Sequence, residues 1–223
     1  MKKIIKLLSV CAMVTLTSSA FAQAQNFEGF SVYASTGYNS WKSGASNLVW
    51  DGVPETGVTF DSVESGATPL NLGLEYTYPI DKQFTVGISW ETNMLGGKSG
   101  TGGTYRDGVN RDVAVTGIAK SGSYQLSLTP GVVIAPNTLL YGKVGYYSLS
   151  NDYTLGGGQI QSFTSTGYGL GAGIKQMLSK NIFGFGELNT RIAMSKNQTS
   201  SEGYSIDLKV DGMSALVGVG VKF

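Results

Sequence analysis

The last eleven residues of the chain, MSALVGVGVKF, alternate strictly in character. From Met213 onward the side chains on one parity are apolar, and most of those between them are small. A period of two places the two sets on opposite faces of a β-strand. The pattern runs to the terminal Phe223, whereas the last residues of most domains are loose because nothing holds them. The sequence therefore predicts that the end of the chain is fixed within a sheet.

The same alternation recurs along the chain and predicts eight strands. Their ranges are 29–41, 69–78, 84–92, 123–134, 139–149, 164–175, 182–193 and 205–223. The connections alternate between short turns (79–83, 135–138, 177–181) and long spacers (43–68, 93–122, 150–163, 194–204). Eight strands joined in this way predict an antiparallel sheet whose long loops all lie at one end.

The first residues, 1–22, are typical of a secretory signal peptide. Three lysines form a basic head, and a mostly apolar stretch then leads to a small-x-small sequence ending at Ala22. We expect cleavage between Ala22 and Gln23, with the bond after Ala24 as the alternative. The mature domain would then be 23–223.

Cleavage would change the chemistry that is available to the protein. The only cysteine, Cys11, lies in the signal peptide, and the chain has no histidine. The mature chain would therefore lack a disulfide, a thiol nucleophile, and the commonest general base and metal ligand. We predict no enzyme activity and no cofactor. Of 16 basic residues the signal removes three, leaving 13 against 15 acidic ones, a net charge of −2. Such a surface predicts no nucleic-acid partner.

Composition decides between a soluble sandwich and a membrane barrel. Charged residues are 14% of the chain, against about 25% in ordinary domains. Glycine is abundant, at 32 of 223 residues. No mature segment approaches the run of about 18 apolar residues that a membrane-spanning helix needs. The face opposite the apolar one carries mainly Gly, Ser, Asn and Thr, which suits a narrow lumen better than a water-exposed sheet face. Aromatic residues gather near the strand ends, as in a membrane-interface girdle: Tyr38, Trp41, Tyr76, Tyr78, Trp90, Tyr124, Tyr146 and Phe223.

The sequence thus predicts an all-β fold, a closed eight-stranded antiparallel transmembrane β-barrel. The chain is long for eight strands, and the surplus lies in 43–68 and 93–122. Ten strands remain an alternative, because 57–63 and 112–119 could each belong to an extra hairpin. Extension of the eight strands beyond the bilayer is the simpler account.

Several charged side chains fall on the inner face of this barrel. They are Glu75, Glu91, Lys143, Lys175, Glu187, Arg191 and Lys222. We expect the glutamates at 75 and 187 to pair with lysines at 143, 175 or 222, because an unpaired buried charge is costly. With three inward tyrosines they would plug a lumen that has room for side chains and little else: Tyr33, Tyr141 and Tyr147.

With the strands laid out, the chain resembles the small outer-membrane β-barrel family that includes OmpX-like, OmpA-type and opacity-type proteins. The segments that carry the resemblance are LGLEYTYPIDKQFTVGISWE (72–91), LLYGKVGYY (139–147), GYGLGAGIK (167–175) and LVGVGVKF (216–223). The resemblance implies residence in the outer membrane of a Gram-negative bacterium, in contact with its lipid and lipopolysaccharide. It also implies that Phe223 is part of the signal read by the barrel-assembly machinery. With eight strands, both termini would lie in the periplasm.

Two functions remain open at this stage. In the first, the barrel is a non-enzymatic anchor whose long loops serve structural or adhesion-type contacts, with 43–68 and 93–122 meeting a host or cell-surface ligand. In the second, it is a narrow porin-like channel for small solutes. A lipid-modifying enzyme is disfavoured because enzymes of this kind generally use a histidine.

Overall fold

The computed structural model describes residues 24–50, 52–54, 59–60, 63–95, 104–106, 112–155, 159–199 and 204–223. Nearly all of them lie in β-strands, and one short 3-10 turn, η1 (Ala24–Phe27), precedes the first strand. Within these ranges no helix has the length and apolarity needed to cross a membrane. The predicted signal peptide, 1–22, lies outside the described residues, so its cleavage stays a prediction.

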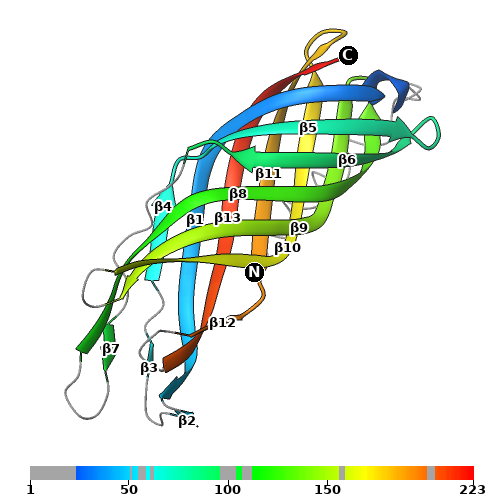
Figure 1. Cartoon of the computed structure of the whole chain (residues 1–223). Coiled ribbons are helices and arrows are strands. Elements are labelled where there is room, and N and C mark those ends of the chain that lie inside the picture. Colours follow the sequence, from blue (N-terminus) through cyan, green and yellow to red (C-terminus); the bar gives the residue numbers. More distant parts are fainter. Residues whose placement is uncertain are drawn as a thin grey trace, which may run out of the picture.

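Eight strands form a closed ring in which each is antiparallel to both neighbours. In chain order they are β1 (Gly29–Trp50), β5 (Leu70–Pro79), β6 (Phe84–Asn93), β8 (Asp112–Ala135), β9 (Thr138–Leu155), β10 (Gln159–Met177), β11 (Ile182–Ala193) and β13 (Tyr204–Lys222). β13 pairs with β1 and closes the barrel (Figure 1). The Phe223 N–H donates to the Phe30 carbonyl at 2.8 Å, so the chain ends inside the closing seam. Closure removes the sheet edge, which hydrocarbon cannot solvate.

In the part of the chain that the structure describes, five shorter strands lie outside the ring. They are β2 (Val53–Pro54), β3 (Thr59–Phe60), β4 (Val63–Ala67), β7 (Thr104–Arg106) and β12 (Lys196–Thr199). Figure 1 shows most of them gathered at the end opposite the C-terminus. The ten-stranded alternative is wrong. β3 pairs with β7 beyond the ring, and residues 112–119 are the outer part of β8, so the surplus length extends strands that already belong to the barrel.

The region 150–163 differs from the long loop that we predicted. β9 and β10 continue as one ladder until Leu155 lies opposite Gln159. Here polar side chains bond across the hairpin, as from Ser162 Oγ to Asp152 Oδ1 at 2.6 Å. Beyond the bilayer a strand no longer needs an apolar face, and the apolar alternation that identified it therefore ends early.

The outer wall of the barrel is an apolar band. Its outer side chains on β13 run from Met213 to Phe223, which is about 33 Å along the strand at 3.3 Å per residue. At the usual tilt of such strands this corresponds to a height of about 25 Å, the thickness that outer-membrane barrels present to lipid. Exposed aromatic residues border the band at one edge (Tyr38, Trp90, Tyr124, Tyr146, Tyr168) and at the other (Phe30, Tyr76, Tyr78, Phe84, Phe223).

Trp41 is an exception to the predicted girdle. Its side chain is buried inside the barrel, on the same parity as Tyr33 and Asn39. The ring lies over Gly212 of the neighbouring β13, where any side chain would collide with it. The rings of Tyr33 and Tyr141 are seated in the same way, over Gly73 and Gly173 respectively. Inward glycines therefore make room for large aromatic residues in a narrow lumen.

Candidate functional site

The centre of the lumen holds a set of buried charges contributed by five strands. Its members are Glu75 (β5), Glu91 (β6), Lys143 (β9), Lys175 (β10), Glu187 and Arg191 (both β11). Three carboxylates meet three cations, so this central network is neutral when all six groups are ionised. Each of these residues lies on the inward-facing side of its strand, as the alternation predicted, and the side chains therefore meet in the lumen.

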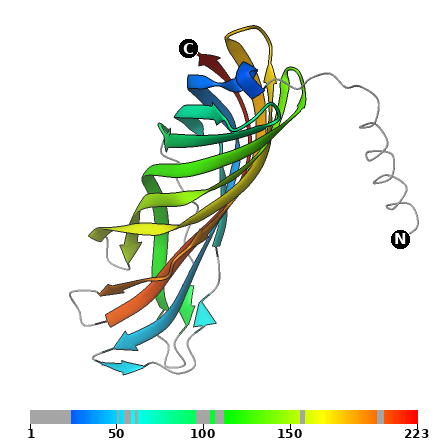
Figure 2. The same ribbon diagram turned by 90° about the vertical axis from the view of Figure 1, so that its right-hand side faces the viewer.

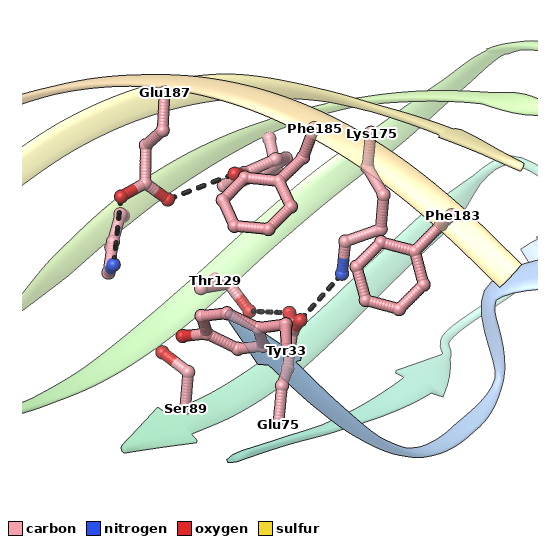
Figure 3. A pocket seen from close by; sticks show the side chains of 10 residues that line it. Tyr33, Glu75, Ser89, Thr129, Lys175, Phe183, Phe185 and Glu187 are labelled. Atoms are coloured by element: carbon pink, nitrogen blue, oxygen red, sulfur yellow. Dashed lines mark hydrogen bonds and ion pairs between the residues drawn. The ribbon is translucent and has the colours of Figure 1, made fainter. Parts of the chain in front are cut away.

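One part of the network is a simple pair across the lumen. Lys175 Nζ lies 2.5 Å from Glu75 Oε2 (Figure 3). The other oxygen, Glu75 Oε1, accepts a hydrogen bond from Thr129 Oγ1 at 3.0 Å. The Lys175 ammonium also lies 4.8 Å from the centre of the Phe183 ring, within the range of a cation–π contact. The pair therefore has polar and aromatic support on both sides.

Lys143 is the centre of the second part. Its Nζ donates to Glu187 Oε1 at 3.0 Å and to Glu91 Oε2 at 3.4 Å. Glu187 also accepts from the hydroxyl of Tyr141 at 2.9 Å and from Asn189 Nδ2 at 2.7 Å. One lysine thus bridges two carboxylates. The Tyr141 hydroxyl binds the second oxygen of Glu187, and Asn189 shares Oε1 with Lys143.

Arg191 completes the network on the outward side. Its Nη2 lies 3.8 Å from Glu91 Oε1, and its Nε donates to Gln125 Oε1 at 3.1 Å. The guanidinium lies 5.5 Å from the Trp41 ring centre. Within the described structure, Arg191 Nη1 has no hydrogen-bond partner, and Arg191 lines the same outward cavity as Asn39.

Among the described residues, two small cavities adjoin the network. The inner one is bordered by Lys143. It is also bordered by the Glu75–Lys175 pair (Figure 3). The outer one is bordered by Glu91 and Arg191. In each, the space open to the centre of a water-sized sphere is about 10 Å³, which is the room of one water molecule.

Apolar side chains close the lumen on either side of the charges. The cluster near the C-terminal end consists of Ala24, Phe27, Tyr33, Val133, Leu139, Tyr141, Met177 and Phe183. The cluster in the outward part consists of Trp41, Tyr147, Leu149, Phe163, Ala193, Leu208 and Val210. The lumen is therefore layered, with a charged centre between two apolar clusters.

The other residues singled out from the sequence lie elsewhere. Lys222 is partly buried at the rim, where its Nζ donates to the Asn26 carbonyl at 2.9 Å. Phe223 is 73% exposed, and its ring centre lies 6.4 Å from that of Phe30. The cleavage residues Ala22 and Gln23 lie outside the described residues. So do 51, 55–58 and 61–62 in the first long spacer, and 96–103 and 107–111 in the second.

Besides Trp41, sequence reasoning missed other contributions to the filled lumen, among them Phe27 and Phe163. Phe27 precedes the first strand, where no alternation indicates a face, so nothing in the sequence marked it as interior. Phe163 lies in the predicted loop 150–163 and was not assigned to a strand. Its parity with Ser165 and Gly167 would have placed it inward if β10 had been extended.

Comparisons with known proteins agree with this architecture. Residues 8–223 match the family model described as outer membrane protein beta-barrel domain. The chain belongs to this family. It is an outer-membrane β-barrel of a Gram-negative bacterium. No curated protein matches the sequence.

Two solved outer-membrane proteins, OprG and OmpT, share the fold. OprG from Pseudomonas aeruginosa is 16% identical, with a TM-score of 0.54 over 88% of this chain and 96% of that one. The outer membrane protease OmpT from Escherichia coli is 12% identical, with a TM-score of 0.50 over 94% and 99%. Ail, the attachment invasion locus protein of Yersinia pestis, is 19% identical, with a TM-score of 0.46 over 88% and 99%. At these identities the likeness concerns the fold alone.

Proposed function

We propose that this protein is a non-enzymatic anchor, a filled barrel that carries long extracellular connections for structural or adhesion-type contacts. The single observation that carries the proposal is the neutral central network of six buried charges between two apolar clusters. Both termini would lie in the periplasm, because outer-membrane barrels have their short turns there and their long loops outside.

The filled lumen argues against a steady pore. A water path would require Lys143 to leave two carboxylates, or Lys175 to leave Glu75. Breaking one buried pair typically costs about 3–5 kcal/mol. Each adjoining cavity has the room of one water, whereas a conducting lumen needs a continuous column. The alternative function, a narrow porin-like channel for small solutes, would need a rearranged network.

The carboxylates of the network are poorly suited to catalysis. Glu75, Glu91 and Glu187 each contact a buried cation and are themselves buried, so a substrate could reach none of them without opening the lumen. With no histidine in the chain, we propose no hydrolytic or acyl-transfer role. Lipid A from cells with and without the protein should give the same mass spectrum.

The part of the barrel that continues outward beyond the apolar band, which we call the outward extension, can support binding loops. β1 and β13 stay paired as far as Trp50 opposite Tyr204, well beyond Tyr38 at the outer edge of the apolar band. The outward apolar cluster fills this part of the barrel. We infer that the outward extension holds 43–68 and 93–122 above the lipopolysaccharide layer, where these loops can meet a host or cell-surface ligand.

Two measurements test the proposal together. The purified protein in planar bilayers should give no steady current, and reproducible open-channel current would favour the pore.

To test adhesion, residues 94–122 are replaced by Asn-Gly. Asn93 and Ser123 are strand partners, so a two-residue turn can join them. Cells carrying the shortened barrel should bind epithelial monolayers less well than wild type. Equal binding by the two strains, with equal surface levels, would contradict the adhesion role.

We also propose that Phe223 is read during assembly. Phe223→Ala should lower the amount of folded protein in the outer membrane. Phe30→Ala is the matched control, because Phe30 lies beside Phe223 and is also exposed on the outer wall, at the edge of the apolar band nearer the short turns. If Phe223 only adds apolar burial, on the order of 2 kcal/mol, the two variants should behave alike.

A further inference from the structure

The residues before the first strand enter the barrel instead of trailing from it. Ala24 is completely buried and Phe27 is 3% exposed, although η1 is only four residues long. Phe27 belongs to the apolar cluster that includes Tyr33 and Phe183. Figure 2 shows η1, in blue, at the same end of the barrel as the C-terminus. This end carries the short turns, so the segment occupies the predicted periplasmic mouth.

Hydrogen bonds tie this segment to distant points around the mouth. The Ala24 N–H donates to the Lys82 carbonyl in the β5–β6 turn at 3.0 Å. Asn26 Nδ2 donates to the Pro136 carbonyl in the β8–β9 turn at 2.8 Å, and the Asn26 carbonyl accepts from Lys222 Nζ at the end of β13. A segment held by two separate turns and by the closing strand lies across the opening.

Gly29 lets the chain pass from the barrel wall into the mouth. Its φ is +120°, a conformation that residues with a side chain rarely adopt. A Cβ at this position would also lie 2.6 Å from the carbonyl oxygen of Phe223. The glycine therefore meets two local requirements at once, a backbone turn and a close approach to the end of β13.

We propose that residues 24–27 are a built-in stopper, and that the periplasmic mouth is its binding site. The proposal also assigns the processing site. Cleavage after Ala22 keeps the buried Ala24 and its bond to Lys82, whereas cleavage after Ala24 would remove both. It explains why Lys222 lies at the rim, since its ammonium binds the stopper. This inference does not depend on the anchor function, because it concerns one end of the lumen and not its centre.

Single cysteines test the docking directly, because the chain has no cysteine after Cys11. Ala24→Cys and Gln25→Cys are a matched pair, one at a buried and one at an exposed position in the same turn. In the folded barrel, Ala24→Cys should react with a maleimide reagent about tenfold more slowly than Gln25→Cys, or slower still. Adding Phe27→Ala should bring the two rates together. Equal rates without Phe27→Ala, in variants that keep the gel mobility of the folded barrel, would overturn the stopper.

The unmodified protein provides a second, independent measurement. Its intact mass should correspond to a chain beginning at Gln23, and a chain beginning at Gln25 would overturn the proposal. In amide exchange followed by NMR, the Ala24 N–H should be protected about tenfold or more relative to an unfolded chain. Exchange at the unfolded rate would show that the segment is not docked. A conducting barrel with a protected Ala24 would refute both the anchor and the blocking role of the segment, whereas a silent barrel with an unprotected Ala24 would refute the stopper alone.

Discussion

The lumen and the outward extension both contain lysine–glutamate ion pairs, but those in the lumen are buried and the one in the extension is exposed to water. In the lumen, the side chains of Lys143 and Glu187 are only 2% and 4% exposed. In the extension, Lys42 Nζ lies 3.7 Å from Glu64 Oε1, with side chains that are 57% and 68% exposed. Water screens the second pair and would solvate either partner if the other were removed, whereas nothing replaces a lost partner in the lumen. The stability of the barrel should therefore depend strongly on the first pair and hardly on the second.

The largest effect should come from Lys143→Met. The change leaves Glu91 and Glu187 without their shared cation, beside a cavity that has the room of only one water molecule. We expect a loss of about 3–5 kcal/mol in the free energy of unfolding. Unfolding by urea in detergent measures this loss. The folded fraction at each urea concentration is read from the mobility of unboiled samples in SDS gels. Adding Glu187→Gln should recover part of the loss, and a loss below about 1 kcal/mol for Lys143→Met alone would contradict the buried network.

A smaller but still large effect should follow from Glu75→Ala. This carboxylate binds one cation, Lys175, and one hydroxyl, that of Thr129. We expect a loss of about 3 kcal/mol, the lower end of the range for a broken buried pair. The matched control Glu75→Gln keeps an acceptor for Thr129 and should lose less. If both variants unfold at the wild-type urea concentration, the pair contributes nothing to stability.

Acid should affect the extension through Asp207. Hydrogen bonds from Asn47 and Asn197 hold the pKa of this exposed carboxyl below its ordinary value of 3.8. A lowered folded pKa contributes stability that is present above the ordinary value and is lost as the pH falls through the folded pKa. We expect a small loss below about pH 4 and none between pH 5 and 7. Asp207→Asn should flatten this part of the profile of urea midpoint against pH. An unchanged slope would show that the loss arises elsewhere.

The smallest effect should come from Lys42→Met, which breaks the exposed pair with Glu64. We expect a change of no more than about 0.5 kcal/mol, because both groups are already solvated. The same urea titration measures it beside Lys143→Met. A loss comparable to that of Lys143→Met would remove the distinction between lumen and extension.

The parity of each strand could be predicted from the sequence because it is a local property. Side chains alternate along any β-strand, and lipid on one side demands an apolar face. The alternation in 69–78 and 84–92 thus placed Glu75 and Glu91 inside before any partner was known. The barrel class and its eight-strand closure follow from the same reasoning, because an open edge is not tolerated in hydrocarbon.

The polar strands beyond the lipid could not be predicted in this way. The hairpin that β9 and β10 form over 150–155 and 159–163 continues beyond the apolar band and needs no apolar row there, so its sequence resembled a loop. Trp41 was assigned to the girdle because it lies near the end of a predicted strand. Its parity, together with the space above Gly212, determines that it turns inward.

The choice of partners was decided only by the tertiary structure. Glu75 and Lys175 are 100 residues apart and meet across the lumen, so their pairing depends on the stagger of the strands around the ring. Lys222 shares the inward parity, yet it lies at the rim and binds Asn26, because its height along the barrel axis differs from that of the carboxylates. The sequence by itself determined which face each residue occupies, since that depends on the backbone of one strand. The height of each residue, and hence its partner, depends on how all eight strands are staggered when the barrel closes.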